Sequence, residues 1–267
     1  MIGIIHTLGG CGGTLLSRCL GVLPGVALLS EINPASVGLF PAFDPLYQDC
    51  AWLHLLDAAE AAEFSKKDLC DIENFRQLVS VFYQRATATA RRLVLRDYSY
   101  VDFVGVPYTA TPPRRLLLRT ALPHAVPTSS IAFVRHPIDQ WVSLCKHKQV
   151  RDVLAPSAFC DAYAAFLQEF GTQRVYKYET FVQNPHGELR AICDDLELPF
   201  DPSFIHRFHE FDCVTGDFTR LGETISAPQR KVLPPDLAAE FHSSASFRYV
   251  LAAAGYPESN PDADRLS

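Results

Sequence analysis

The fold is decided by residues 2–20, which read IGIIHTLGGCGGTLLSRCL. The first residues are apolar and rich in isoleucine, as in a buried strand. A glycine-rich turn follows, and Thr14 opens what reads as a helix. Strand, glycine turn and helix together form a phosphate-binding loop, in which backbone N–H groups surround phosphate oxygens at a helix N-terminus. We therefore predict phosphate binding by the residues of this turn, which are Gly9, Gly10, Cys11, Gly12, Gly13, Thr14 and Leu15.

This loop lacks the cation that such loops commonly carry. The nucleotide-hydrolase pattern G-x-x-x-x-G-K-[ST] places a lysine directly after its last glycine. Gly13 stands at that position and Thr14 follows it. The positive charge must therefore come from elsewhere in the chain, and the candidates are His6, Arg18, Arg96 or a basic residue of the C-terminal region.

Composition narrows the class of protein. The chain has 267 residues, of which 48% are hydrophobic, so a sizeable core is expected. The net charge of −6 disfavours a broad nucleic-acid surface. The eight cysteines are scattered without metal-ligand spacing, and no basic leader or membrane-length apolar segment is visible. We expect a cytoplasmic protein without nucleic-acid partners, membrane insertion or a metal, with a single domain over 1–256 and a polar tail over 257–267.

Strands and helices alternate along the sequence. Apolar runs predict strands over 2–5, 26–30, 93–95, 131–134 and 174–178. Helical periodicity or helix-start signals predict helices over 14–23, 73–90, 138–149, 157–170 and 185–196. This alternation indicates an α/β fold of three layers, α/β/α, with a central parallel sheet of about five strands.

A polar cluster follows each predicted strand, where ligands bind in parallel sheets. Taken in chain order, these clusters are the glycine turn, Glu31, Arg96-Asp97, Arg135-His136 and Tyr178-Glu179. Each could instead be a surface or helix-capping group when taken singly. Their shared sheet edge favours an active-site crevice.

Two segments carry a more specific signal. Residues 131–143 read IAFVRHPIDQWVS, in which a strand ends at Arg135 and Ser143 follows eight residues later (143 − 135 = 8). Residues 174–200 contain a Tyr-Glu pair after a strand, an Asn-Pro turn, and a helix that ends in Leu-Glu-Leu-Pro. With residues 2–20, these segments resemble the sulfotransferases that use 3′-phosphoadenosine 5′-phosphosulfate (PAPS). The family's loop has a basic residue where this chain has Gly10.

The resemblance implies roles for particular residues. The glycine turn would bind the 5′-phosphate, and Arg135 and Ser143 would bind the 3′-phosphate. Tyr178 belongs to the family's Tyr-Glu strand, so we also expect it at the nucleotide. In the family a late basic loop closes over the 3′-phosphate and the adenine. Its counterparts here would be Arg220, Arg230 and Lys231.

The catalytic histidine of the animal enzymes has no counterpart in this chain, so other residues must supply the cation and the general base. We expect Arg96 to supply the missing cation, with His6 as a further candidate. A rival alignment uses residues 119–123 instead of the Arg96 strand. A glutamate near the position of Glu31 resembles the base of the family's carboxylate-using branch, and Asp97 is the second candidate. A general base of this kind must lie near the donor sulfur.

These patterns predict transfer of a sulfuryl group from PAPS, the co-substrate, to a hydroxyl or amine of a small-molecule or sugar acceptor. Two alternatives stay open. One is a nucleotide-binding relative that has lost catalysis. The other is a small-molecule kinase, which the missing loop lysine disfavours. Residues 34–90 and 100–129 are expected to line a partly apolar acceptor cleft.

Overall fold

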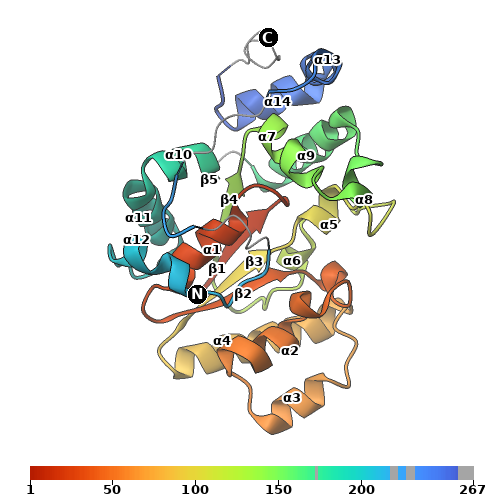
Figure 1. Cartoon of the computed structure of the whole chain (residues 1–267). Coiled ribbons are helices and arrows are strands. Elements are labelled where there is room, and N and C mark those ends of the chain that lie inside the picture. The colour runs from red at the N-terminus through yellow and green to blue at the C-terminus, as the bar shows by residue number, and fades with distance from the viewer. Residues whose placement is uncertain (172–173, 217–221, 227–231, 258–267) are drawn as a thin grey trace.

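A parallel five-stranded sheet organises the computed structural model, which describes residues 1–171, 174–216, 222–226 and 232–257 (Figure 1). Its strands lie in the order β2-β3-β1-β4-β5, and all neighbouring pairs are parallel. The strands are β1 (Ile2–Thr7), β2 (Val26–Ile32), β3 (Arg92–Asp97), β4 (Thr128–Val134) and β5 (Val175–Lys177). β1 is central, so the loop that follows it lies at the middle of the sheet edge.

Helices cover both faces of this sheet. The longer ones are α1 (Gly13–Gly21), α3 (Ala58–Phe64), α4 (Ile72–Ala88), α7 (Pro137–Leu144), α9 (Pro156–Phe170), α10 (Tyr178–Gln183), α11 (Pro185–Leu196), α13 (Pro235–Ser243) and α14 (Ala245–Ala253). Single turns or short helices are η1 (Pro34–Ser36), η2 (Pro41–Phe43), α2 (Pro45–Gln48), η3 (Asp49–Leu53), α5 (Tyr100–Phe103), α6 (Leu117–Thr120), α8 (Lys148–Arg151), α12 (Phe204–Arg207) and η4 (Phe208–Glu210). No described helix is long and apolar enough to cross a membrane.

Alternate residues of the strands feed two cores. Ile5 of β1 and Val94 of β3 pack with α1 and α11 on one face. Their neighbours Ile4 and Leu95 pack with α4 on the other face, where every buried position of α4 follows the helical period. Strands buried on both faces read as continuous apolar runs, which is why the sequence identified them. The predicted three-layer α/β fold is confirmed.

Several boundaries differ from the prediction. The helix expected over 138–149 ends at Leu144, and α8 begins only at Lys148. The chain between them turns, so that Lys146 and His147 reach the central cavity. The strand expected over 174–178 is shorter, because Arg174 has the left-handed φ of 58° and Tyr178 already begins α10.

No helix was predicted after residue 196, but α13 and α14 are regular α-helices. Both pack against α9 (Figure 1). Phe241 of α13 and Phe247 of α14 are buried in the same core as Phe159 of α9. The spacing of apolar residues would have predicted α14, since Phe247, Val250 and Leu251 recur at helical intervals. The expected tail beyond Pro257 lies outside the described residues.

Candidate active site

The glycine loop (residues 8–13) joins the central strand β1 to α1. Gly10 and Gly12 have φ values of 79° and 93°, which side chains rarely adopt. A Cβ on Gly12 would lie 2.3 Å from Cδ2 of Tyr178, and one on Gly10 would lie 3.1 Å from the Gln140 carbonyl oxygen. The loop therefore requires glycine at both positions, and this explains why position 10 carries no basic side chain.

Arg96, at the end of β3, supplies positive charge beside the loop. A Cβ on Gly13 would lie 3.7 Å from Nη1 of Arg96, which is van der Waals contact, so the guanidinium lies directly beside the end of the glycine loop. Arg96 is only 1% exposed, and its Nη1 donates to Thr14 Oγ1 at 3.5 Å and Ser17 Oγ at 3.3 Å. The structure thus brings Arg96 to the glycine loop from the neighbouring strand.

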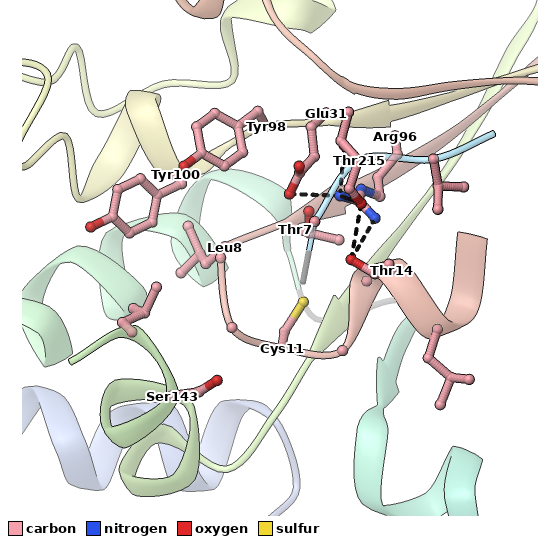
Figure 2. Close-up of a pocket in the computed structure, with 18 of the residues that line it drawn as sticks. Thr7, Leu8, Cys11, Thr14, Glu31, Arg96, Tyr98, Tyr100, Ser143 and Thr215 are labelled. Atoms are coloured by element: carbon pink, nitrogen blue, oxygen red, sulfur yellow. Dashed lines mark hydrogen bonds and ion pairs between the residues drawn. The ribbon is translucent and has the colours of Figure 1, made fainter. Parts of the chain in front are cut away.

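Arg96 also contacts the predicted general base. Its Nη2 lies 2.6 Å from Oε1 of Glu31, whose side chain is 14% exposed (Figure 2). The two terminal nitrogens of one guanidinium therefore contact different groups, Glu31 on one side and Thr14 on the other. Nε of Arg96 is buried without a hydrogen-bond partner among the described residues.

A bulge in β2 directs Glu31 toward this position. Glu31 has a φ of 56°, and the pairing of β2 with β3 shifts register between Leu29 and Ile32. Strand bulges re-aim side chains in this way, and left-handed conformations of non-glycine residues cluster at functional sites. Gln48 braces the bulge: its Oε1 accepts from Ser30 N at 2.7 Å and its Nε2 donates to Ser30 O at 2.6 Å.

His6 and Asp97 lie in a different place from the one we expected. Both are fully buried, and neither lines the cavity. Oδ2 of Asp97 lies 2.7 Å from His6 Nδ1 and accepts from Ser99 Oγ at 2.6 Å, while Oδ1 accepts from Asn33 Nδ2 at 2.9 Å. This network ties β1, β3 and the chain after β2 together beneath the site. His6 and Asp97 therefore support the strands beneath the site, and neither is proposed as a catalytic group.

Arg18 is also occupied elsewhere. Its guanidinium is buried and donates to the carbonyls of Phe208 and His209, so it fastens α1 to η4. Of the candidate cations among the described residues, Arg96 is the one that the structure places at the loop. Arg220, Arg230 and Lys231 lie outside the described residues.

A cavity of about 1120 Å³ extends from the glycine loop and is lined by Arg135, Ser143 and Tyr178 among others. The guanidinium carbon of Arg135 lies 4.8 Å from the centroid of the Tyr178 ring, and its buried Nε has no partner among the described residues. Ser143 of α7 lies against the loop, since its Cβ would be 3.3 Å from a Cβ on Gly10. The structure thus brings together the four predicted elements: the loop, Arg135, Ser143 and Tyr178.

Cys11 and Leu15 complete the predicted loop residues, and both line the cavity. Cys11 is buried, which raises the pKa of its thiol to about 11. The neutral thiol is therefore a packing group at neutral pH. No group of three or more His, Cys, Asp or Glu in the described part of the chain is arranged to hold a metal ion.

Thr215 is a site residue that the sequence reading missed. Its carbonyl oxygen accepts from Thr14 Oγ1 at 3.1 Å and from Arg96 Nη2 at 3.4 Å (Figure 2). Its backbone N–H donates to Ser30 Oγ at 3.1 Å. A distant segment thus closes over the start of α1. Nothing in a lone Thr-Gly pair distinguishes this role in the sequence.

A parallel α/β sheet with a glycine loop after its central strand defines a phosphate-binding type of fold. Residues 5–202 match the model of the sulfotransferase family, so the chain belongs to that family. Membership of this family makes the chain a transferase. The predicted family is confirmed.

Two solved structures share the fold. The sulfotransferase domain from the curacin biosynthetic pathway is 18% identical, with a TM-score of 0.62 and coverage of 96% of this chain and 99% of that one. The sulfotransferase domain from the Synechococcus PCC 7002 olefin synthase is 19% identical, with a TM-score of 0.58 and coverage of 95% and 93%. No curated protein matches the sequence significantly.

Proposed function

We propose that this protein transfers a sulfuryl group from PAPS to a hydroxyl or amine of a small-molecule acceptor. The observation that carries the proposal is the position of Arg96, whose two terminal nitrogens contact Glu31 and the loop residue Thr14. The arginine supplies the charge that the loop itself lacks, next to a carboxylate suited to be a base.

Under this proposal, the cavity would bind two phosphates. Backbone N–H groups of the glycine loop, the Thr14 hydroxyl and Arg96 would bind the 5′-phosphate at the N-terminus of α1. Arg135 and Ser143 would bind the 3′-phosphate, for which the unpartnered Nε of Arg135 is a ready donor. Because both groups line one cavity with the loop, a nucleotide carrying two separate phosphates fits this arrangement.

The chemistry follows from these positions. Negative charge develops on the phosphate oxygen that leaves the sulfur, and cations aimed at that oxygen lower the barrier. Arg96 is placed for this role beside Thr14. Glu31 would accept the proton of the acceptor hydroxyl while Arg96 Nη2 holds its carboxylate in place. Positioning and charge stabilisation together thus account for the transfer.

The alternative of a kinase is disfavoured by Asp97. A kinase of this fold needs a carboxylate after β3 that holds magnesium. Both carboxylate oxygens of Asp97 are instead hydrogen bonded to protein groups in the buried network. The carboxylate of Asp97, at the end of β3, is therefore not free to hold magnesium, which disfavours this alternative.

Calorimetric titration with 3′-phosphoadenosine 5′-phosphate (PAP) and with adenosine 5′-phosphate (AMP) tests the nucleotide site. PAP should bind more tightly than AMP. Arg135→Ala should remove most of this preference, because it acts on the 3′-phosphate alone. Arg96→Gln should weaken both nucleotides. Arg92→Ala, at the exposed opposite end of β3, is the matched control and should change neither. Absence of PAP binding at millimolar concentration would contradict the proposal.

Transfer of labelled sulfate from PAPS to a panel of hydroxyl and amine compounds tests catalysis. The wild-type protein should label at least one compound, and Glu31→Gln should label it about 100-fold more slowly or worse. If PAP binds but neither protein labels any compound of a broad panel, the protein is better described as a nucleotide-binding relative without catalysis.

A further inference from the structure

We propose, resting on the function proposed above, that the acceptor is a neutral hydroxyl compound with an aromatic or hydrocarbon body. The inference comes from five aromatic residues that line the central cavity near Glu31. We call them the aromatic wall: Phe40, Phe43, Tyr98, Tyr100 and Tyr108.

The rings of the aromatic wall contact one another in a closed circuit. Their centroids are 5.1 Å apart for Phe40 and Phe43, 4.9 Å for Phe43 and Tyr98, and 5.6 Å for Tyr98 and Tyr100. Tyr108 closes the circuit at 6.4 Å from Tyr100 and 5.7 Å from Phe40. These separations are typical of attractive aromatic pairs, so the rings support one another as a preformed surface.

The wall lies next to the proposed base. Figure 2 shows Tyr98 and Tyr100 side by side, with Tyr98 next to Glu31. Burial raises the pKa of Tyr98 well above its usual range, and the charge of Glu31 raises it further. Burial is also the main cause of the raised pKa of Tyr108, and the charge of Glu31 contributes to it. A hydroxyl carried on a body held by these rings would therefore lie close to the Glu31 carboxylate.

The wall has few free polar groups. The Tyr100 hydroxyl donates to the Val106 carbonyl at 2.6 Å, and Tyr98 is 8% exposed. Arg96, which lines the same cavity, is paired with Glu31. A sugar or other polyol would give up its bonds to water here without replacements, which is unfavourable. An aromatic or alkyl body has no hydrogen bonds to water to give up, and burial of its apolar surface against the rings is favourable.

Phe40 marks the entrance to this part of the cavity. Its side chain is 43% exposed, although it belongs to the wall, while Phe43 and Tyr98 lie deeper. Apolar and aromatic side chains are the usual lining of small-molecule clefts, so Phe40 offers an apolar ligand a surface at the mouth of this cleft. The body of the acceptor would therefore extend from Glu31 outward to Phe40.

Calorimetric titration of the PAP-saturated protein with 2-naphthol and with glucosamine tests the inference. We expect 2-naphthol to bind at least about tenfold more tightly, since burial of one aromatic body accounts for such a factor. Phe43→Ala and the rim variant Phe40→Ala should each weaken 2-naphthol binding and leave the affinity for PAP unchanged. Tyr249→Ala, an exposed position on α14, should change neither. Equal binding of glucosamine, or no effect of either phenylalanine variant, would overturn the inference.

The two proposals fail in different ways. If PAP binds but 2-naphthol does not, the aromatic acceptor is excluded and the nucleotide assignment stands. If PAP does not bind while 2-naphthol binds the free protein and Phe40→Ala weakens it, the nucleotide assignment fails and the apolar cleft stands. Phe40→Ala serves as the variant least able to disturb folding, because its side chain is partly in solvent.

Discussion

Glu31 combines three unusual properties at the scale of single residues. It has a left-handed backbone, it interrupts the pairing of a buried strand, and it forms an ion pair with an arginine that is 1% exposed. A glutamate kept in such a conformation costs about 1–3 kcal/mol, which the surrounding structure must offset. A purely structural salt bridge would not need the bulge, so the conformation supports a role in the reaction.

Replacement of Glu31 by glutamine should lower kcat by about 100-fold or more, since this is the usual contribution of a general base. The amide keeps the shape of the side chain but cannot accept the acceptor's proton. Affinity for PAP should be retained. Steady-state sulfate transfer together with calorimetry measures both quantities, and Glu63→Gln on the surface of α3 is the control. An unchanged kcat would exclude Glu31 as the base.

Two glycines with similar backbones offer a matched test of the loop. Gly12 and Gly38 have φ values of 93° and 84°, but a Cβ on Gly12 meets Tyr178 whereas one on Gly38 meets nothing within 4 Å. Each alanine variant carries a backbone cost of about 1–2 kcal/mol. Gly12→Ala must also displace Tyr178, so it alone should lose affinity for PAP. Similar losses in both variants would show that backbone strain, rather than contact with Tyr178, is responsible.

The sequence predicted the positions of some site residues correctly and those of others not. Arg96 was identifiable because it follows the apolar run 93–95, where the sulfotransferases that the sequence resembles often carry a basic residue. His6 and Asp97 also follow or end strands, yet their side chains turn into the buried network rather than into the cavity. Strand position alone does not say which way a side chain points at the end of a strand. Thr215 carried no local signal at all.

At the scale of elements, the segment from η2 to α2 holds the bulge of β2 in place. Gln48 at the end of α2 is fully buried and bonds to both backbone groups of Ser30, as a neighbouring strand would. Its Nε2 also donates to the Ala42 carbonyl at 2.6 Å. A side-chain amide thus gives Ser30, on the edge strand of the sheet, the backbone hydrogen-bond partners that a further strand would provide.

We expect Gln48→Ala to destabilise the protein by about 1–3 kcal/mol, because it leaves buried backbone groups of Ser30 without partners. It should also lower kcat while leaving the KM for PAPS unchanged, since Glu31 then loses its fixed position. Urea unfolding and steady-state kinetics measure the two effects. Gln77→Ala, on the exposed face of α4, should be neutral in both. A loss of stability with unchanged kcat would limit Gln48 to a structural role.

Long elements were predicted better than short ones. The helix at α4 has a strong helical period, and the strands buried on both faces are continuous apolar runs; the structure confirms both. The break between α7 and α8 was not predictable from local pattern, because residues 138–149 contain no glycine or internal proline to mark it. Tertiary contacts decide it, among them the bond from the Trp141 ring nitrogen to the Leu154 carbonyl.

At the scale of the whole molecule, a buried carboxyl cluster makes stability depend on pH. Asp102 is fully buried, and its Oδ2 accepts from Asn33 Nδ2 at 3.0 Å and from Leu117 N at 3.1 Å. Burial, and secondly the charge of Asp97, raise the pKa of Asp102 well above its usual range. The folded state therefore keeps a proton at Asp102 that the unfolded chain releases above a pH of about 3.9.

The sign of the effect follows from this difference. The unfolded state binds fewer protons, so the contribution of Asp102 to the free energy of unfolding falls as pH rises from about 4 toward the raised pKa, by at most about 1.4 kcal/mol per pH unit. Urea unfolding at a series of pH values should show this decline, and Asp102→Asn should flatten it. Asp236→Asn, at an exposed position of α13, should leave the slope unchanged. A slope that persists in Asp102→Asn would assign it to other groups.

Residues 40–48 contribute both to the aromatic wall and to the support of the strand that carries Glu31. Phe40 and Phe43 contribute to the aromatic wall, and Gln48 braces the strand that carries Glu31. In the proposed function, acceptor preference and placement of the base therefore depend on the same stretch of chain. Grafting this loop from a relative to change the acceptor would also replace Gln48, so we expect the graft to lower both kcat and stability unless it keeps a glutamine at position 48.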